Sequence, residues 1–262
     1  MHEVPLSQPS PLDQVLRRER LVLVACLAAV VVLAWGYLLA GAGMDTSMPG
    51  MAMAPMAWTT GTALLMFAMW WVMMIAMMAP SAGPTVLLFS AIGRKQAAVG
   101  KPSVAAGFFL TGYLVVWAGF SLVATVLQWA LQQLGLMAME MKTSSHLLGG
   151  SILLAAGLYQ FTPVKRACLR HCQTPLLFIS SHWKPGAAGA LRMGLRHGAY
   201  CLGCCWFLMA LLFFGGIMNF LWIAGIAIYV AMEKLLPKSQ WLSGATGTVL
   251  ALAGLLILAG VL

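Results

Sequence analysis

Long runs of uncharged apolar residues constrain this chain more than any other feature. Runs of about 20 such residues recur along its 262 residues, and each can cross roughly 30 Å of hydrocarbon as a helix. Hydrophobic residues make up 61% of the chain and charged residues only 8%, so the chain cannot give a globule an ordinary water-facing surface. The sequence predicts an all-α, polytopic membrane protein and excludes a soluble globule.

The apolar runs predict about seven transmembrane helices in a single integral membrane domain, 1–262. The run at 199–232 is too long for one crossing and has Gly215-Gly216 at its centre, so we expect two short helices joined by a turn. The run at 60–92 contains Pro80 and Pro84, so we expect one crossing that is interrupted near 79–84. The runs are 21–42, 60–92, 104–130, 144–161, 199–232 and 242–262.

The basic residues lie in short segments between the apolar runs, which indicates membrane orientation rather than a nucleic-acid partner. With a cytoplasmic N-terminus, 14 of the 15 Lys and Arg residues fall on the inner side, and only Lys142 lies outside. If 199–232 crossed once, Lys234 and Lys238 would face outward. The charge distribution therefore favours the hairpin independently of its length.

Five of the six cysteines form two groups, each accompanied by a histidine. The first lies in a cytoplasmic loop at 163–197 and the second at the start of the fifth apolar run, which places both at the cytoplasmic boundary. Thiolate and imidazole are ligands for Cu⁺ and Zn²⁺, so we expect the two groups to share a metal ion. Simple packing of small apolar side chains and a redox dithiol are the alternatives. The residues are Cys168, His171, Cys172, His197, Cys201, Cys204 and Cys205.

A methionine-rich outward loop at 43–58 is the second group of soft ligands. Thioethers do not titrate, and they suit Cu⁺ in an oxidising compartment where free thiols would be lost. The alternative is a flexible loop whose methionines rest on the bilayer surface. The five residues are Met44, Met48, Met51, Met53 and Met56.

A stripe of methionines follows this loop along the second expected span. Met66, Met69, Met73 and Met77 are spaced by three and four residues, so they fall on one side of a helix. The stripe either fills gaps between helices or forms a path for Cu⁺ from the outward loop to the cysteines. A path requires these side chains to face the interior of the helix bundle.

Three motifs resemble those of a bacterial family of uncharacterised integral membrane proteins described as predicted metal-binding. They are Met-Trp-Trp-Val-Met-Met-Ile-Ala-Met-Met-Ala-Pro at 69–80, Gly-Leu-Tyr-Gln at 157–160 leading to Cys-Leu-Arg-His-Cys at 168–172, and His-Gly-Ala-Tyr-Cys-Leu-Gly-Cys-Cys-Trp at 197–206. The resemblance covers about 60–238, and the methionine-rich loop lies outside it. It implies several helices and a link to copper.

These observations favour a non-enzymatic, multi-pass protein of the bacterial inner membrane that binds Cu⁺ and transfers it. The expected partners are the lipid bilayer, the metal ion and a copper-dependent membrane or periplasmic enzyme, with zinc as the alternative metal and no nucleic acid. No Ser/His/Asp set, phosphate-binding glycine loop or paired carboxylates occur. The alternatives are a membrane thiol-disulfide oxidoreductase that uses the clustered cysteines and a structural or assembly subunit.

Overall fold

The computed structural model describes residues 11–40, 58–98, 106–137, 143–236 and 239–261. Within these ranges the chain is helical, and an isolated bridge between Met137 and Thr143 is the only extended pairing. The all-α prediction is therefore confirmed for the described residues. The helices are α1 (Pro11–Leu39), α2 (Thr60–Ala98), α3 (Ala106–Gln133), α4 (His146–Tyr159), α5 (Pro163–Gln173), α6 (Pro175–His182), α7 (Gly186–Gly215), α8 (Phe220–Leu235) and α9 (Gln240–Leu258).

Five helices in the described ranges are long and apolar enough to cross a bilayer, namely α1, α2, α3, α7 and α9. Helices α4 and α5 form a pair that is bent by 65°, and counting this pair as one span raises the number to six. The predicted number of about seven spans is thus not confirmed. The difference is α8, whose 16 residues are short of the roughly 20 that a crossing needs.

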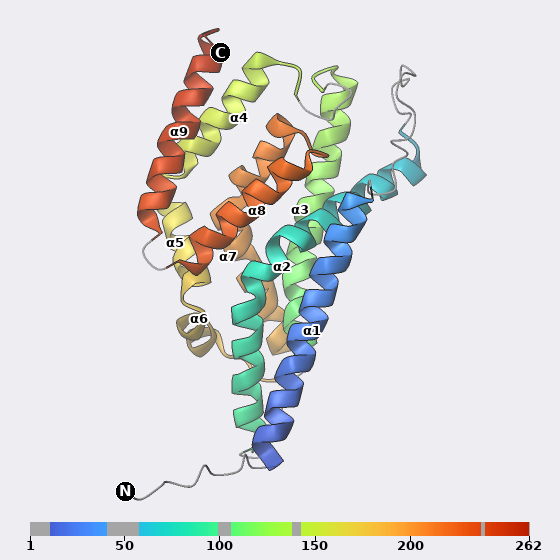
Figure 1. The fold of residues 1–262 in the computed structure, drawn as a ribbon, viewed down its shortest axis with the longest axis vertical. Helices are drawn as coiled ribbons and strands as arrows, with labels where there is room; N and C mark the ends of the chain where they lie inside the picture. The colour runs from blue at the N-terminus through green and yellow to red at the C-terminus, as the bar shows by residue number, and fades with distance from the viewer. Residues whose placement is uncertain (1–10, 41–57, 99–105, 138–142, 237–238, 262) are drawn as a thin grey trace, which may run out of the picture.

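Helix α2 continues without a break through Pro80 and Pro84, where the sequence predicts an interruption. Figure 1 shows that the helix changes direction along its course instead. Neighbouring side chains bind the carbonyl oxygen of Met78 at this point, because Ser81 Oγ donates to it at 2.9 Å and Tyr113 Oη at 3.1 Å. The helix therefore changes direction in the region of its two prolines without ending there.

The predicted hairpin is present, with different limits. Helix α7 ends at Gly215, Gly216 has a positive φ of 97°, and Asn219 caps α8 by accepting a hydrogen bond from the Trp222 amide at 3.2 Å. Only glycine adopts this φ readily, which explains the position of the turn. Helix α7 starts at Gly186, however, rather than at residue 199.

The segment 163–197, expected to be a loop, is helical over most of its length. It contains α5, α6 and the first twelve residues of α7. Thr162 caps α5 by accepting a hydrogen bond from the Lys165 amide at 3.2 Å, and prolines occupy the first positions of α5 and α6. Proline is tolerated there because the first helical N–H groups have no partner within the helix.

Helices α3 and α7 lie side by side through the middle of the molecule, while α4 and α9 pair at the end that carries the C-terminus (Figure 1). The α3–α7 contact depends on two glycines, because a Cβ atom on Gly112 would meet the α7 backbone and one on Gly194 would meet the carbonyl oxygen of Phe109. Small residues let helix backbones approach closely in this way. The contact fixes the position of α7, on which three cysteines lie.

Candidate metal centre

Three buried cysteines of α7 lie in the interior of the protein, and the cysteines of α5 lie beside them. Cys201, Cys204 and Cys205 share one face of α7 because they are spaced by three and four residues, and each is only 1% exposed. Cys172, at the end of α5, is partly buried and lies near Cys201 and Cys204. The structure therefore brings the two cysteine groups of the sequence together.

These cysteines lie at the middle of α7 rather than at the start of a span. The reason is that α7 begins at Gly186, so Cys201 follows more than four helical turns. The thiols of Cys204 and Cys205 donate to the carbonyl oxygen of Cys201, each at 3.0 Å. They are thus directed back along their own helix, toward Cys201.

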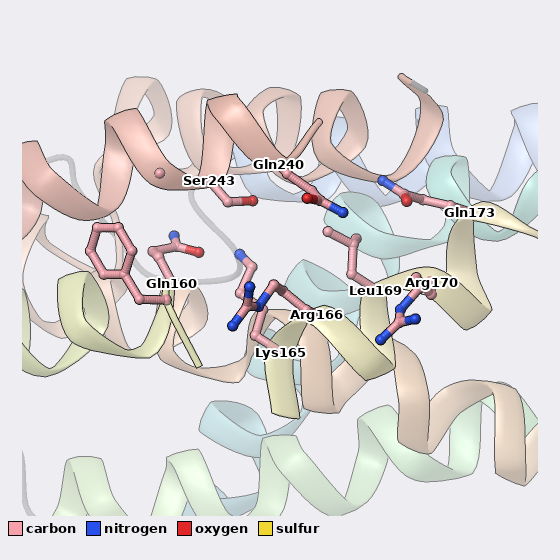
Figure 2. A pocket seen from close by; sticks show the side chains of 10 residues that line it. Gln160, Lys165, Arg166, Leu169, Arg170, Gln173, Gln240 and Ser243 are labelled. Carbon is pink, nitrogen blue, oxygen red and sulfur yellow. The ribbon is translucent and has the colours of Figure 1, made fainter. Parts of the chain in front are cut away.

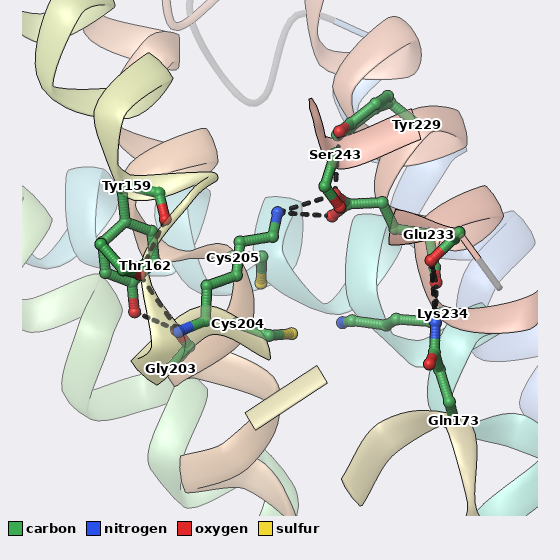
Figure 3. Close-up of polar contacts among 12 residues, drawn as sticks. Tyr159, Thr162, Gln173, Gly203, Cys204, Cys205, Tyr229, Glu233, Lys234 and Ser243 are labelled. Atoms are coloured by element: carbon green, nitrogen blue, oxygen red, sulfur yellow. Dashed lines mark hydrogen bonds and ion pairs between the residues drawn. The ribbon is translucent and has the colours of Figure 1, made fainter. Parts of the chain in front are cut away.

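Cys168 lies at the edge of this group. It is half-buried, and its Sγ atom lies against Gly203, where an added Cβ would approach to 2.8 Å. Tyr159, at the end of α4, donates a hydrogen bond to the carbonyl oxygen of Gly203 at 2.5 Å (Figure 3). Gly203 is therefore the point at which α4 and α5 contact the cysteine-bearing part of α7.

A lysine ammonium group contacts the thiols, although the sequence analysis assigned this lysine only to the cytoplasmic side. Lys234 of α8 is 5% exposed, and its Nζ atom lies 2.9 Å from Cys201 Sγ, 3.6 Å from Met78 Sδ and 3.4 Å from Ser81 Oγ. Figure 3 shows its side chain pointing toward Cys204. No local sequence pattern predicts this contact, because Lys234 and Cys201 are 33 positions apart in the chain.

Met78 and Tyr113 also contact the thiols. Tyr113 Oη lies 3.1 Å from Cys201 Sγ, and Met78 Sδ lies 4.0 Å from Cys205 Sγ. Met78 is fully buried on α2, directly after Met77 of the methionine stripe. A thioether from α2 therefore joins thiols from α5 and α7.

A buried ion pair holds α5, α8 and α9 together beside the cysteines. Lys165 Nζ lies 2.7 Å from both carboxylate oxygens of Glu233, and both side chains are 1% exposed. Tyr229 and Ser243 donate further hydrogen bonds to Glu233 Oε1, at 2.8 and 2.5 Å (Figure 3). The pair sets the position of α5 and hence of Cys172, because α5 carries both Lys165 and Cys172.

The two predicted histidine ligands have aromatic surroundings. His171 stacks on Tyr200 with ring centroids 4.0 Å apart, and it is only half-buried. His197 is 2% exposed and lies between the rings of Phe109 and Phe178, and its Nδ1 atom has no hydrogen-bond partner among the described residues.

The methionine stripe faces the interior of the bundle. Met66, Met69 and Met73 are 0% exposed and Met77 is 1% exposed. Gln128 Nε2 contacts Met66 Sδ at 3.6 Å, and Gln128 Oε1 accepts a hydrogen bond from Trp70 at 2.7 Å. The outward loop with Met44, Met48, Met51, Met53 and Met56 lies outside the described residues.

Within the part of the chain that the structure describes, no group of three or more His, Cys, Asp or Glu side chains is arranged to hold a metal ion. Tetrahedral zinc centres need four such ligands, whereas Cu⁺ accepts sulfur ligands that include the methionine thioether. The thiols and the thioether of Met78 are soft sulfur ligands of the kind that Cu⁺ accepts.

Comparison with known proteins agrees with this chemistry. The model of the PpoB2 family, described as copper chaperone, matches residues 67–257, which is well over half of the chain and includes α3 to α9 with all the cysteines of the two groups. No curated protein and no solved structure matches the chain. The chain belongs to the PpoB2 copper chaperone family.

Proposed function

We propose that this protein is a membrane-embedded copper chaperone that receives Cu⁺ at the buried thiols and passes it to a copper-dependent enzyme. The observation that carries the proposal is the meeting of buried sulfur atoms from α2 and α7, because Met78 Sδ lies 4.0 Å from Cys205 Sγ, beside Cys201 and Cys204. Two helices that are distant in sequence thus supply sulfur to one buried position. Cu⁺ is the metal ion whose ligand preferences this sulfur set matches.

Charge balance supports the same site. Cu⁺ held by two thiolates carries one net negative charge, and an uncompensated buried charge is costly. The ammonium group of Lys234, 2.9 Å from Cys201 Sγ, offsets that charge. Cys201 with Cys172 or Cys204 as thiolate ligands, and Met78 or Cys205 as a further sulfur ligand, is the proposed copper set.

A route for the ion follows from the burial of the methionine stripe. Met66, Met69, Met73 and Met77 lead along α2 toward Met78, whose thioether faces Cys205. A cation inside a helix bundle needs soft ligands at each position along its way. We propose that Cu⁺ passes from the loop at 43–58 along this stripe to the thiols.

The membrane setting supports the direction of this route. The distribution of basic residues favours a cytoplasmic N-terminus, with the loop at 43–58 on the outer side of the bacterial inner membrane. Large apolar side chains are exposed on α1, α3 and α9, as a lipid-facing surface requires.

Metal analysis of the purified protein tests the site. We expect the detergent-solubilised, reduced protein to retain about one Cu⁺ in competition with a chromogenic Cu⁺ chelator. The double variant C201S/C204S should lose this copper, since serine offers no soft ligand. C26S is the matched control, because Cys26 is exposed on α1, away from the other five. Absence of copper from the wild-type protein would refute the proposal.

The route is tested separately by M69L/M73L/M77L. Leucine keeps the volume nearly constant but has no lone pair, so the folded triple variant should load copper from outside more slowly while it binds copper normally in detergent. Loading is measured in vesicles by copper retained at the cysteines. Unchanged loading in the triple variant would show that the stripe only packs.

A thiol-disulfide oxidoreductase is the second candidate, because Cys201, Cys204 and Cys205 lie on one helix face with Cys172 near them. Such an enzyme would show a reversible two-electron couple on titration of the thiols at defined potentials. Thiols that are masked by copper and inert to this titration favour the chaperone.

A further inference from the structure

A polar cavity of about 180 Å³ lies where α4, α5 and α9 meet, and Lys165 of the Lys165–Glu233 ion pair is part of its lining (Figure 2). Its lining includes Gln160 at the end of α4, Lys165, Arg166 and Arg170 on α5, and Gln240 and Ser243 on α9. No aspartate or glutamate lines it. The cavity is therefore separate from the proposed copper site and has an excess of positive charge.

The buried side-chain amide of Gln160 lies in the lining of this cavity. The side chain is 3% exposed, and neither Nε2 nor Oε1 has a hydrogen-bond partner among the described residues. Figure 2 shows its amide directed toward the space between Ser243 and Lys165. Leaving a buried donor or acceptor unpaired is unfavourable, so a bound group with both acceptor and donor oxygens would be stabilised here.

The charge of the cavity comes from two arginines. Glu233 neutralises Lys165 at 2.7 Å, which leaves the guanidinium groups of Arg166 and Arg170, one helical turn apart on α5. The planar guanidinium group donates paired hydrogen bonds to phosphate oxygens. The cavity thus combines two phosphate-binding side chains with an amide that both donates and accepts.

The place of the cavity in the fold gives such a group access. Helices α4 and α9 both have an end here, and the chain turns by 65° from α4 into α5. The basic residues of α5 belong to the inner side of the membrane by the charge distribution, where lipid phosphates lie. An exposed pair of arginines over a polar cavity matches the chemistry of a lipid headgroup at that level.

We infer that this cavity binds the phosphate group of an anionic ligand, held by Arg166, Arg170 and Gln160. An anionic phospholipid of the inner leaflet and free phosphate share this chemistry. In either case the ligand would stabilise the junction of α4, α5 and α9 on which the position of α5 depends. This inference does not require the copper proposal to hold.

Native mass spectrometry of the full-length protein tests the inference. The protein is exchanged into detergent with phosphatidylglycerol, or into detergent with inorganic phosphate and no lipid. The bound molecules are then identified from the mass of the complex. R166Q and R170Q should each weaken retention roughly tenfold, as expected for a lost charge-assisted hydrogen bond. K95Q removes one exposed positive charge outside the cavity and should leave retention unchanged.

The variant Q160L separates the cavity from general charge attraction. It should weaken retention without altering the net charge, and the ligand-free protein should keep its thermal stability because the Gln160 amide has no partner to lose. Retention of phosphatidylglycerol that inorganic phosphate does not displace identifies a lipid as the ligand. If the protein retains inorganic phosphate, or if phosphate displaces phosphatidylglycerol, the ligand is the free ion. This outcome also supports the site. Retention of neither, or equal losses in K95Q and R166Q, would overturn the inference.

Discussion

At the scale of single residues, two buried lysines on different helices have different partners. Lys165 is paired with the carboxylate of Glu233, whereas Lys234 contacts sulfur atoms of Cys201 and Met78. Both ammonium groups are almost fully enclosed. A buried charge persists only where a partner compensates it, so each lysine marks a position where the fold depends on a specific pair.

Replacement of Lys234 tests its role at the thiols. K234L removes the charge and offers no soft ligand, so copper affinity in chelator competition should fall roughly tenfold to a hundredfold, the range for a hydrogen bond to a charged group. K234R should retain most of the affinity because it keeps the positive charge. K95L is a matched control at an exposed lysine. Normal affinity in a folded K234L protein would show that Lys234 does not compensate the copper site.

Breaking the Lys165–Glu233 pair should affect stability rather than copper chemistry. E233Q leaves the Lys165 ammonium without a counter-charge, and we expect a loss of about 3–5 kcal/mol in the free energy of unfolding. The double variant K165M/E233L removes both charges and should recover much of that loss. Thermal unfolding in detergent measures both variants, and equal destabilisation of E233Q and the double variant would contradict the expected coupling.

At the scale of elements, the site depends on how closely α7 approaches α3. Gly194 and Gly112 allow backbone contact between the two helices, and this contact sets Tyr113 of α3 beside Cys201 of α7. The methionine side of α2 then covers the same thiols through Met78. Three helices thus contribute to one buried group only because two of them lack side chains at their crossing.

A single methyl group at the crossing should separate the helices. G194A places Cβ against the carbonyl oxygen of Phe109, so we expect a loss of at least about 1–3 kcal/mol in stability and weaker copper binding. The matched control is G119A on α3, where an added Cβ meets nothing within 4 Å. Unfolding temperature and copper retention are measured for both, and a tolerated G194A would show that the crossing is less tight than described.

At the scale of the whole molecule, the long helices build the core and its apolar outer surface, whereas the short helices carry single side chains into the core. Helices α2, α3 and α7 form the core around the thiols, and α1 and α9 expose large apolar side chains on the outside. The short helices α5 and α8 bring Cys172 and Lys234 into that core. Under the proposed function, this arrangement shields the copper site from water between the two membrane faces.

The orientation of the molecule is open to a direct test. In oriented membranes, a membrane-impermeant maleimide should label K142C from the outer side and K95C only from the inner side, because the basic residues favour the cytoplasm. The parent protein gives the background, since its clustered cysteines at α7 are 1% exposed. The opposite labelling pattern would invert the proposed direction of copper movement.

Much of the local structure could be read from the sequence. The apolar runs predicted the long helices, and the two glycines at 215–216 predicted the turn between α7 and α8. The stripe of methionines faces inward, as a path requires. Residues 163–197 were predicted to be a loop and the start of α7 was placed too late, because this segment contains charged residues that interrupt the apolar pattern although it is helical. The interruption of α2 at its prolines was also predicted wrongly, because packing inside a helix bundle tolerates proline where local rules predict a break.

The sequence by itself determined that this chain is helical, apolar and rich in soft ligands, because composition and local spacing depend only on residues close together in the chain. Only the tertiary structure decided which ligands meet. Cys172 reaches Cys201, Lys165 reaches Glu233 and Lys234 reaches the thiols across 29 to 68 positions of sequence. These pairings follow from the helix crossings, and a crossing is set by the shapes of two surfaces that no single stretch of sequence contains.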